Sequence, residues 1–158
     1  VEDGGRVTAG NSSQITDGAS ALLIMSEEKA QQLGLRPRAR FVSFALAGDD
    51  PRLMLTAPIP ATKKVLAKAG LTIDQIDLVE INEAFASVVL AWEKEFNPDM
   101  DKVNVNGGAI ALGHPVGMSG TRLAMTALYE LRRRGGGVAA VALCGGGGQG
   151  DGAILRTL

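Results

Sequence analysis

The sequence has little of what several classes of protein need. One cysteine, Cys144, stands in 158 residues, which excludes an internal disulfide and any site built from several thiolates. Aromatic residues make up only 4% of the chain, too few for the stacking platforms that bind single-stranded nucleic acid. Neither sign of charge dominates, since 16 Lys and Arg stand against 17 Asp and Glu. We therefore expect no nucleic-acid partner, because phosphates bind to an excess of positive charge.

Long hydrophobic runs are missing as well. The longest charge-free stretches, 103–121 and 135–150, are interrupted by polar residues, Gly or Pro and fall short of the roughly 20 apolar residues that span a bilayer. The first residues, VEDGGRV, resemble neither a signal peptide nor a transit peptide, and they are typical of the middle of a longer chain. We expect no membrane partner. Together with the single cysteine, this predicts a cytoplasmic location.

Glycine, in contrast, is abundant, with 21 residues that cluster at 107–120, 135–137 and 145–152. Between these clusters, strand and helix patterns alternate without an internal repeat, which predicts a single α/β domain. Strands are expected at 40–46, 78–81, 103–105, 138–143 and 153–158. Helices are expected at 26–34, 60–69, 82–96 and 119–134.

Three loops follow expected strands, at the position where α/β proteins collect binding residues. They read NEAFA from Asn82, GGAIALGHPVGMSG from Gly107, and CGGGGQG from Cys144. Taken singly, each polar residue also has a structural explanation. Asn82 would cap the following helix, His114 would be a hydrogen-bonded loop histidine, and Cys144 would be a small buried side chain.

Other motifs do not fit these loops. Gly145, Gly147 and Gly150 match G-x-G-x-x-G, but a strand-like segment follows them where a dinucleotide-binding motif needs a helix. The loop around His114 has no lysine for a phosphate-binding loop. One histidine and one cysteine are too few ligands for a metal site. We therefore expect no metal and no permanently bound cofactor.

Together and in this order, the three loops closely resemble the C-terminal half of the thiolases, the acetyl-CoA acyltransferases. The segments VTAGNSSQITDGA near the start and PIPATKKVLAKAG in the middle extend the resemblance over essentially the whole chain. The resemblance implies a three-layer α/β/α half with a five-stranded mixed sheet. It identifies residues 1–158 as one thiolase C-terminal domain.

The resemblance also implies a role for each loop. His114 would draw the proton from a cysteine nucleophile, and Asn82 would hold a water beside it, so that the pair forms one oxyanion hole. Cys144 would exchange a proton with the carbon of the acetyl-CoA enolate, since a thiol can act both as acid and as base. The amide of Gly146 would donate a hydrogen bond in a second oxyanion hole.

Coenzyme A and acyl-CoA would then be substrates of the reaction. By this resemblance, Ser13 corresponds to the family serine that contacts the pantetheine arm of CoA, and Ala9, Ala84 and Phe85 would line the tunnel that holds this arm. The implied chemistry is acyl transfer between an acyl-enzyme thioester and CoA, coupled to thiolytic cleavage of a 3-ketoacyl-CoA or to the reverse Claisen condensation. The length of the acyl chain stays open.

One departure from the family pattern limits this activity. The sequence context marks Cys144 as the acid–base cysteine, and there is no second cysteine to act as nucleophile. The N-terminal thiolase half is therefore an expected partner, and the isolated chain is expected to be inactive. The expected helix over 119–134 is apolar nearly all round in its first turns, which predicts a homo-oligomer through its unpaired face.

A second hypothesis is a non-catalytic CoA-binding or dimerising module. The presence of Asn82, His114 and Cys144 together favours the enzyme over the module. An upstream reading frame that encodes a cysteine nucleophile would support the enzyme, whereas a start codon just before Val1 would support the module.

Overall fold

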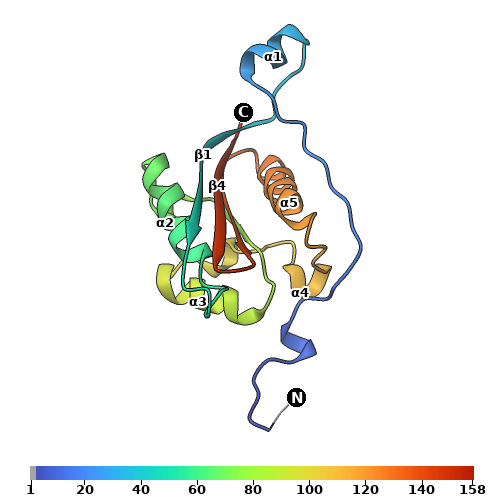
Figure 1. Cartoon of the computed structure of the whole chain (residues 1–158). Coiled ribbons are helices and arrows are strands. Elements are labelled where there is room, and N and C mark those ends of the chain that lie inside the picture. The colour runs from blue at the N-terminus through green and yellow to red at the C-terminus, as the bar shows by residue number, and fades with distance from the viewer. Residues whose placement is uncertain (1–2) are drawn as a thin grey trace.

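A four-stranded mixed sheet in the order β1-β4-β3-β2 forms the centre of the structure, a computed structural model that describes residues 3–158 (Figure 1). The strands are β1 (Ala39–Gly48), β2 (Leu78–Ile81), β3 (Val138–Gly145) and β4 (Gln149–Thr157). β2 pairs with β3 in parallel, whereas β4 pairs antiparallel with both β3 and β1. β2 and most of β3 are buried, and the continuous apolar sequence over 138–143 predicts such a strand, covered on both faces.

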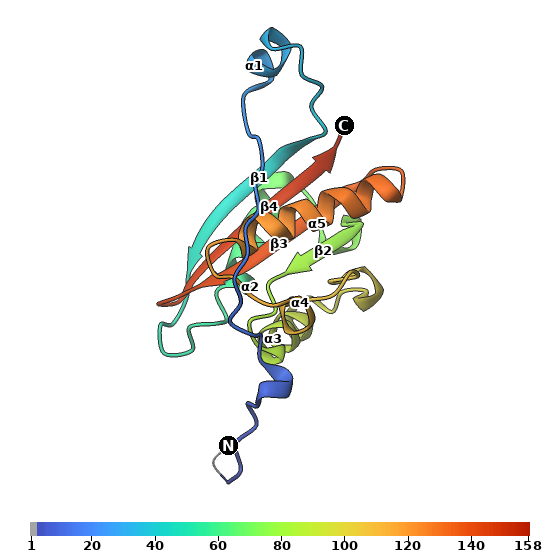
Figure 2. The ribbon, with the colours of Figure 1, turned by 90° about the vertical axis from the view of Figure 1, so that its right-hand side faces the viewer.

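Helices cover both faces of this sheet and make three layers (Figures 1 and 2). The helices are α1 (Glu27–Gln32), α2 (Pro58–Ala69), α3 (Ala86–Phe96), α4 (Ala109–Leu112) and α5 (Ser119–Arg133), with short 3-10 helices at Ala9–Asn11, Ile73–Gln75 and Met100–Lys102. One buried cluster lies between the sheet and α2 with α3, and a second lies under α5. Among residues 3–158, none of the helices combines the length and the apolar character needed to cross a bilayer.

Trp92 joins the two helices on the first face. Its side chain is fully buried, and its indole nitrogen donates to the hydroxyl of Thr62 on α2 at 3.0 Å. Phe96, one turn further along α3, packs against the same indole with 5.0 Å between ring centroids. The apolar spacing that predicts α3 from the sequence is therefore the face that this helix buries.

The predicted fifth strand, over 103–105, is absent from the described sheet, so the expectation of five strands is wrong. Val103 makes only an isolated parallel bridge with Val79. The next residue, Asn104, has a φ of 47°, and its side chain bonds both the amide (2.9 Å) and the carbonyl (3.0 Å) of Ile81. Because the Asn104 side chain occupies the backbone groups that a strand would pair with, the ladder stops after one bridge.

The ends of the predicted helices agree with the structure in two cases and shift in others. Ser26 caps α1 through a bond from the amide of Lys29 at 3.2 Å, and Gly34 follows with a φ of 65°, as the pattern predicts. The prediction of a helix over 119–134 is confirmed by α5. α2 begins two residues before the expected start, because Pro58 can occupy its first turn.

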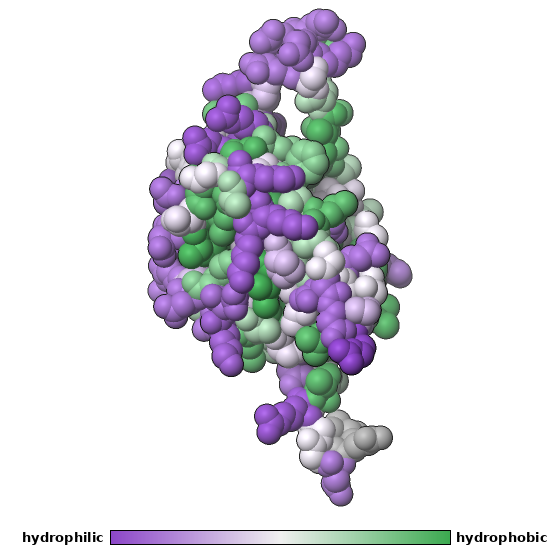
Figure 3. All heavy atoms as spheres, turned by 60° about the vertical axis from the view of Figure 1, so that its left-hand side comes forward, coloured by the Kyte–Doolittle hydropathy of each residue, from purple (hydrophilic) through white to green (hydrophobic). Residues whose placement is uncertain are grey.

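The amino-terminal segment, residues 3–38, runs along the outside of the α5 face, and α1 stands away from the body (Figures 1 and 2). Hydrophilic side chains cover α1 (Figure 3). Several apolar side chains in the segment are nevertheless exposed: Ile15 by 98%, Leu23 by 79% and Ile24 by 65%. The segment touches the body where Ser20 donates to the carbonyl of Met118 at 3.1 Å.

Gly150→Ala should destabilise the fold by roughly 3 kcal/mol, within the range for an overpacked core. A Cβ at Gly150 in β4 would overlap the backbone carbonyl of Ala57, which cannot move aside as a side chain could. The measurement is the free energy of unfolding in urea. Gly48→Ala is the matched control, since its Cβ would meet no atom within 4 Å, and an equal loss in both variants would contradict the prediction.

Candidate active site

The parallel pairing of β2 with β3 brings two of the predicted residues to one edge of the sheet. Ile81 lies opposite Ala142, and the backbone amide of Asn82 donates to the carbonyl of Ala142 at 2.9 Å. Cys144 lies just beyond Ala142 on β3. Asn82 and Cys144 therefore share the carboxyl edge of the two parallel strands, where α/β folds bind their ligands.

Asn82 is fully buried, and its side chain faces the other candidate residues. Its amide nitrogen lies 3.3 Å from Nε2 of His114, and its side chain lowers the pKa of the Cys144 thiol. The interpretation of Asn82 as a helix cap is wrong, because α3 begins only after Phe85, which occupies the N-cap position. Asn82 continues the ladder of β2, so its backbone is not free to open a helix.

His114 reaches this edge from the loop between α4 and α5. Gly113, which ends α4, has a φ of 89°, a value that favours glycine. The backbone amide of His114 donates to the carbonyl of Gln14 at 3.0 Å, so the amino-terminal segment holds this loop from outside. Nδ1 of the ring lies 2.6 Å from the hydroxyl of Ser119. With Asn82 near Nε2, both ring nitrogens of His114 have a polar neighbour.

The electrostatic environment keeps the His114 ring neutral. Burial lowers the pKa of His114 below its ordinary value, and the positive charge of Arg122 lowers this pKa further. The neutral imidazole is therefore the main form at neutral pH. In that form one ring nitrogen carries a lone pair and can accept a proton.

The pKa of Cys144 is shifted in the opposite direction to that of His114. Burial raises the pKa of its thiol, while hydrogen bonds from its own backbone amide and from Asn82 oppose that rise. The thiol is therefore protonated at neutral pH and can give a proton, and the two donors stabilise the thiolate that is left. The site holds one group ready to accept a proton and another ready to donate one, which is the combination that acid–base chemistry needs.

Gly146 lies in the exposed turn that joins β3 to β4. A Cβ at this position would meet no atom within 4 Å, so the fold itself does not require glycine there. A glycine at position 146 is useful where a ligand comes close to the backbone, since a side chain would then be in the way. The role of the Gly146 amide as an oxyanion donor stays a prediction.

The residues expected to contact CoA lie in two segments that meet. The amide of Ser13 donates to the carbonyl of Ala84 at 2.9 Å, and Ser12 forms an isolated bridge with Phe85. Ala9 lies in the 3-10 helix that precedes this contact. Within residues 3–158, no group of three or more His, Cys, Asp or Glu side chains is arranged to hold a metal ion.

Sequence reasoning missed Glu83, which joins the Asn82 loop to the His114 loop. Its carboxylate accepts a hydrogen bond from the amide of Ile110 at 3.1 Å, in the first turn of α4. A Cβ on Gly108 would overlap this carboxylate. The available signal is an acidic residue directly after Asn82 together with a glycine pair that opens a helix, since carboxylates stabilise free amides at helix starts.

A second missed group consists of charges beneath the site. Burial raises the pKa of Glu80 to about 7, Arg122 on α5 lowers that pKa, and Glu130 raises it. The carboxylate of Glu80 and the guanidinium of Arg122 both lack a hydrogen-bond partner within the described part of the chain. Glu80 is the one charged residue in β2, which reads LVEI, and a charge among apolar strand residues is the signal that marks this position.

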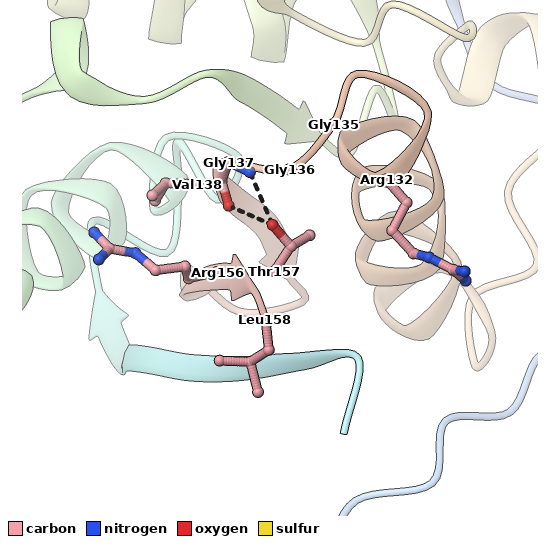
Figure 4. A pocket seen from close by; sticks show the side chains of 8 residues that line it. All are labelled: Arg132, Gly135, Gly136, Gly137, Val138, Arg156, Thr157 and Leu158. Carbon is pink, nitrogen blue, oxygen red and sulfur yellow. Dashed lines mark hydrogen bonds between the residues drawn. The ribbon is translucent and has the colours of Figure 1, made fainter. Parts of the chain in front are cut away.

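A surface hollow at the opposite end of the sheet is not part of this site (Figure 4). It is lined by Arg132, by residues 135–138 and by residues 156–158. The hydroxyl of Thr157 accepts from the amide of Gly137 at 2.8 Å and donates to its carbonyl at 3.3 Å. Arg132 and Arg156, which both line it, point in different directions (Figure 4), so their charges do not converge on one ligand.

Two family models match the sequence. Residues 35–157 match the C-terminal domain of thiolase, and residues 1–28 match the N-terminal domain of thiolase. The chain is 54% identical over 157 residues to an acetyl-CoA acetyltransferase of Syntrophomonas wolfei, an alignment that covers 98% of this chain and 40% of the relative. It is also 54% identical over 156 residues to the steroid 3-ketoacyl-CoA thiolase FadA6 of Mycobacterium tuberculosis, covering 99% and 38%.

A solved structure has the same fold. The crystal structure of human mitochondrial 3-ketoacyl-CoA thiolase in complex with CoA has 49% sequence identity and a TM-score of 0.93. The match covers 96% of this chain and 38% of that one. The chain thus spans about two-fifths of the length of the relatives it matches.

Asn82→Asp should slow the alkylation of Cys144 by iodoacetamide about tenfold near pH 8. The variant replaces a hydrogen-bond donor with a negative charge, and both changes raise the pKa of the thiol and lower the fraction of thiolate. Cys144 is the only cysteine, so the pH dependence of the alkylation rate reports this one group. Asn97→Asp, at the exposed end of α3, adds the same charge and should leave the rate unchanged. A rate that is equal in the two variants would contradict the contact.

Proposed function

The chain belongs to the thiolase family, and from this premise we propose that it is the C-terminal part of an acyltransferase that acts on acyl-CoA. The observation that supports the proposal most directly is the meeting of Asn82, His114 and Cys144 at one edge of the sheet. These residues come from three separate segments of the chain. A neutral imidazole and a protonated thiol next to a buried amide are the groups that carbon–carbon bond cleavage beside a thioester requires.

The proposed reaction in the direction of cleavage has two stages. A cysteine nucleophile attacks the C3 carbonyl of a 3-ketoacyl-CoA, and the bond between C2 and C3 breaks. The electron pair of that bond leaves with C2 as the enolate of acetyl-CoA, which takes a proton from Cys144 at carbon. The acyl group stays on the nucleophile as a thioester until the thiol of a second CoA accepts it, and the reverse sequence is a Claisen condensation.

In this scheme His114 and Asn82 act on the same oxygen. Nε2 of His114 accepts the proton of the nucleophilic thiol and then donates it toward the thioester oxygen. Asn82 holds a water beside Nε2, so that the two donors stabilise the negative charge that develops on that oxygen. The buried position of Asn82 and its 3.3 Å distance from Nε2 fit this arrangement.

The proposed substrates are CoA and its acyl thioesters. The amide of Ser13 is held against Ala84, next to the start of α3, so a pantetheine arm contacting Ser13 would end near Asn82. The similar human structure holds CoA. The residues that choose the acyl chain lie mostly outside this sequence in the family, and the proposal therefore names the thioester class and not one substrate.

The proposed enzyme needs a nucleophile from outside this sequence. The single cysteine is taken by the acid–base role, so the N-terminal thiolase half is the proposed partner that supplies the second thiol. The exposed apolar residues of the amino-terminal segment, Ile15, Leu23 and Ile24, fit a surface that such a partner covers. The chain by itself is therefore expected to turn over no 3-ketoacyl-CoA.

In the complete enzyme, Cys144→Ser should lower kcat for thiolysis of acetoacetyl-CoA by a factor on the order of 10² to 10⁴, the usual contribution of acid–base catalysis. A serine hydroxyl is too weak an acid to protonate the enolate carbon at this rate. Acylation of the nucleophile by acetyl-CoA should continue, because that half-reaction needs no proton transfer at carbon. The two half-reactions are measured separately, by steady-state thiolysis and by label transfer from acetyl-CoA to protein.

Leu143→Val is the matched control for that experiment. Leu143 is the neighbour of Cys144 on β3, but its side chain packs against the cluster under α5. This variant should keep both half-reactions near their original rates. If Cys144→Ser abolished acylation and thiolysis to the same degree, the acid–base assignment would be wrong.

A further inference from the structure

Ser119, the first residue of α5, is fully buried and touches the ring of His114. Its hydroxyl lies 2.6 Å from Nδ1 of His114 and donates to the carbonyl of Pro115 at 2.9 Å. The backbone amide of Ser119 bonds the same carbonyl at 3.0 Å. The bond to Pro115 is therefore part of the first turn of α5, and the same hydroxyl also contacts the ring of His114.

The hydrogen-bond count at Ser119 decides which ring nitrogen carries the hydrogen. A serine hydroxyl has one hydrogen to donate and two lone pairs that accept. Its hydrogen is directed to the carbonyl of Pro115, so the short contact with Nδ1 requires that Nδ1 be the donor. A neutral imidazole has only one N–H. Nε2 must then carry the lone pair.

The other side of the ring gives the same answer independently. The amide nitrogen of Asn82 lies 3.3 Å from Nε2, and an amide nitrogen can only donate. Nε2 must therefore accept, which again leaves the hydrogen on Nδ1. The carbonyl oxygen of Asn82 has no hydrogen-bond partner among the described residues, so the contact of this side chain with the ring is made by its amide nitrogen. A donor at this position also agrees with the lowering effect of Asn82 on the pKa of the Cys144 thiol.

We propose that Ser119 is a positioning residue that holds His114 in the Nδ1–H tautomer and leaves the Nε2 lone pair facing Asn82. The catalytic consequence of this tautomer rests on the proposed function, whereas the tautomer itself does not. Only with a bare Nε2 can His114 accept a proton on the side of the ring that faces Asn82 and Cys144. Ser119 touches neither Cys144 nor Asn82 in the hydrogen bonds of the described residues, so it acts through the histidine.

The charge state of His114 is set by its surroundings, so the position of its single N–H hydrogen decides how the ring can act. Arg122 lies one turn along α5 from Ser119, and its charge, added to burial, disfavours the imidazolium. The ring is therefore neutral at neutral pH, and only its tautomer decides which nitrogen is basic. The backbone on either side is fixed too, since Gly113 is left-handed and Pro115 follows.

Nitrogen NMR of this chain tests the tautomer directly. His114 is the only histidine, so long-range proton–nitrogen spectra show one imidazole and need no assignment by mutation. At about pH 8, above the ordinary pKa of histidine, Nδ1 should resonate as a protonated nitrogen and Nε2 as a bare one. The opposite pattern, with the hydrogen on Nε2, would overturn the proposal whatever the activity of the protein.

Three variants test whether Ser119 is the cause. Ser119→Ala removes the acceptor and should move a large fraction of His114 to the Nε2–H tautomer, whereas Ser119→Thr keeps a hydroxyl and should restore the Nδ1–H pattern. Ser20→Ala is the matched control, because this hydroxyl bonds the same loop at Met118 without touching the ring. An unchanged Nδ1–H spectrum in Ser119→Ala would overturn the positioning role. Amide dispersion verifies the fold of each variant, and the spectrum of the unmodified chain decides the tautomer even if Ser119→Ala does not fold.

The complete enzyme adds a readout that a purely structural role would not move. Ser119→Ala should lower kcat and slow alkylation of the nucleophile at neutral pH by about tenfold or more, with KM for CoA unchanged, because proton abstraction weakens while CoA binding does not. Ser119→Thr should recover most of the rate. A normal kcat in an enzyme whose tautomer has shifted would overturn the catalytic consequence, while the measured tautomer would stand, so this failure differs from a failure of the proposed function.

Discussion

Four parallel pairs, from Leu78 opposite Ala139 to Ile81 opposite Ala142, fix where Asn82 and Cys144 lie relative to each other. Side chains alternate between the two faces of a strand, so a slip of β2 by one residue would turn Asn82 to the other face and away from Cys144. The core opposes that slip, because it would turn Val79 and Ile81 out of one buried cluster and move Glu80 into it. The register that fills the core is thus also the register that builds the site.

Burial has opposite chemical effects on the two titratable side chains at this edge. The same loss of water lowers the pKa of His114, whose charged form is a cation, and raises the pKa of Cys144, whose charged form is an anion. Both groups are thereby kept neutral at neutral pH. A base and an acid can stand near each other in that state without forming an ion pair, which would consume both.

The sequence predicts elements with a long periodic pattern and misses those that depend on a single side chain. The apolar run of β3 and the spacing of α5 define these elements from the residues alone. The strand expected over 103–105 fails because the Asn104 side chain bonds Ile81, a contact without a periodic signal. The sequence indicates the three loops of the site because polar residues and glycines after strands form a local pattern. The sequence does not indicate a role for Ser119, because a serine at a helix start is common for reasons of capping alone.

The amino-terminal segment limits how the length of this chain can change over generations. The carbonyl of Gln14 and the hydroxyl of Ser20 hold the His114 loop from outside, and Gly18 passes so close to Pro115 that a Cβ would not fit between them. Deletion of one residue between Gln14 and Ser20 would therefore pull one of these contacts out of reach. The chain around α1 stands clear of the body (Figure 2) and tolerates extra residues. Insertions and deletions that survive selection should accordingly collect around α1 and avoid residues 14–20.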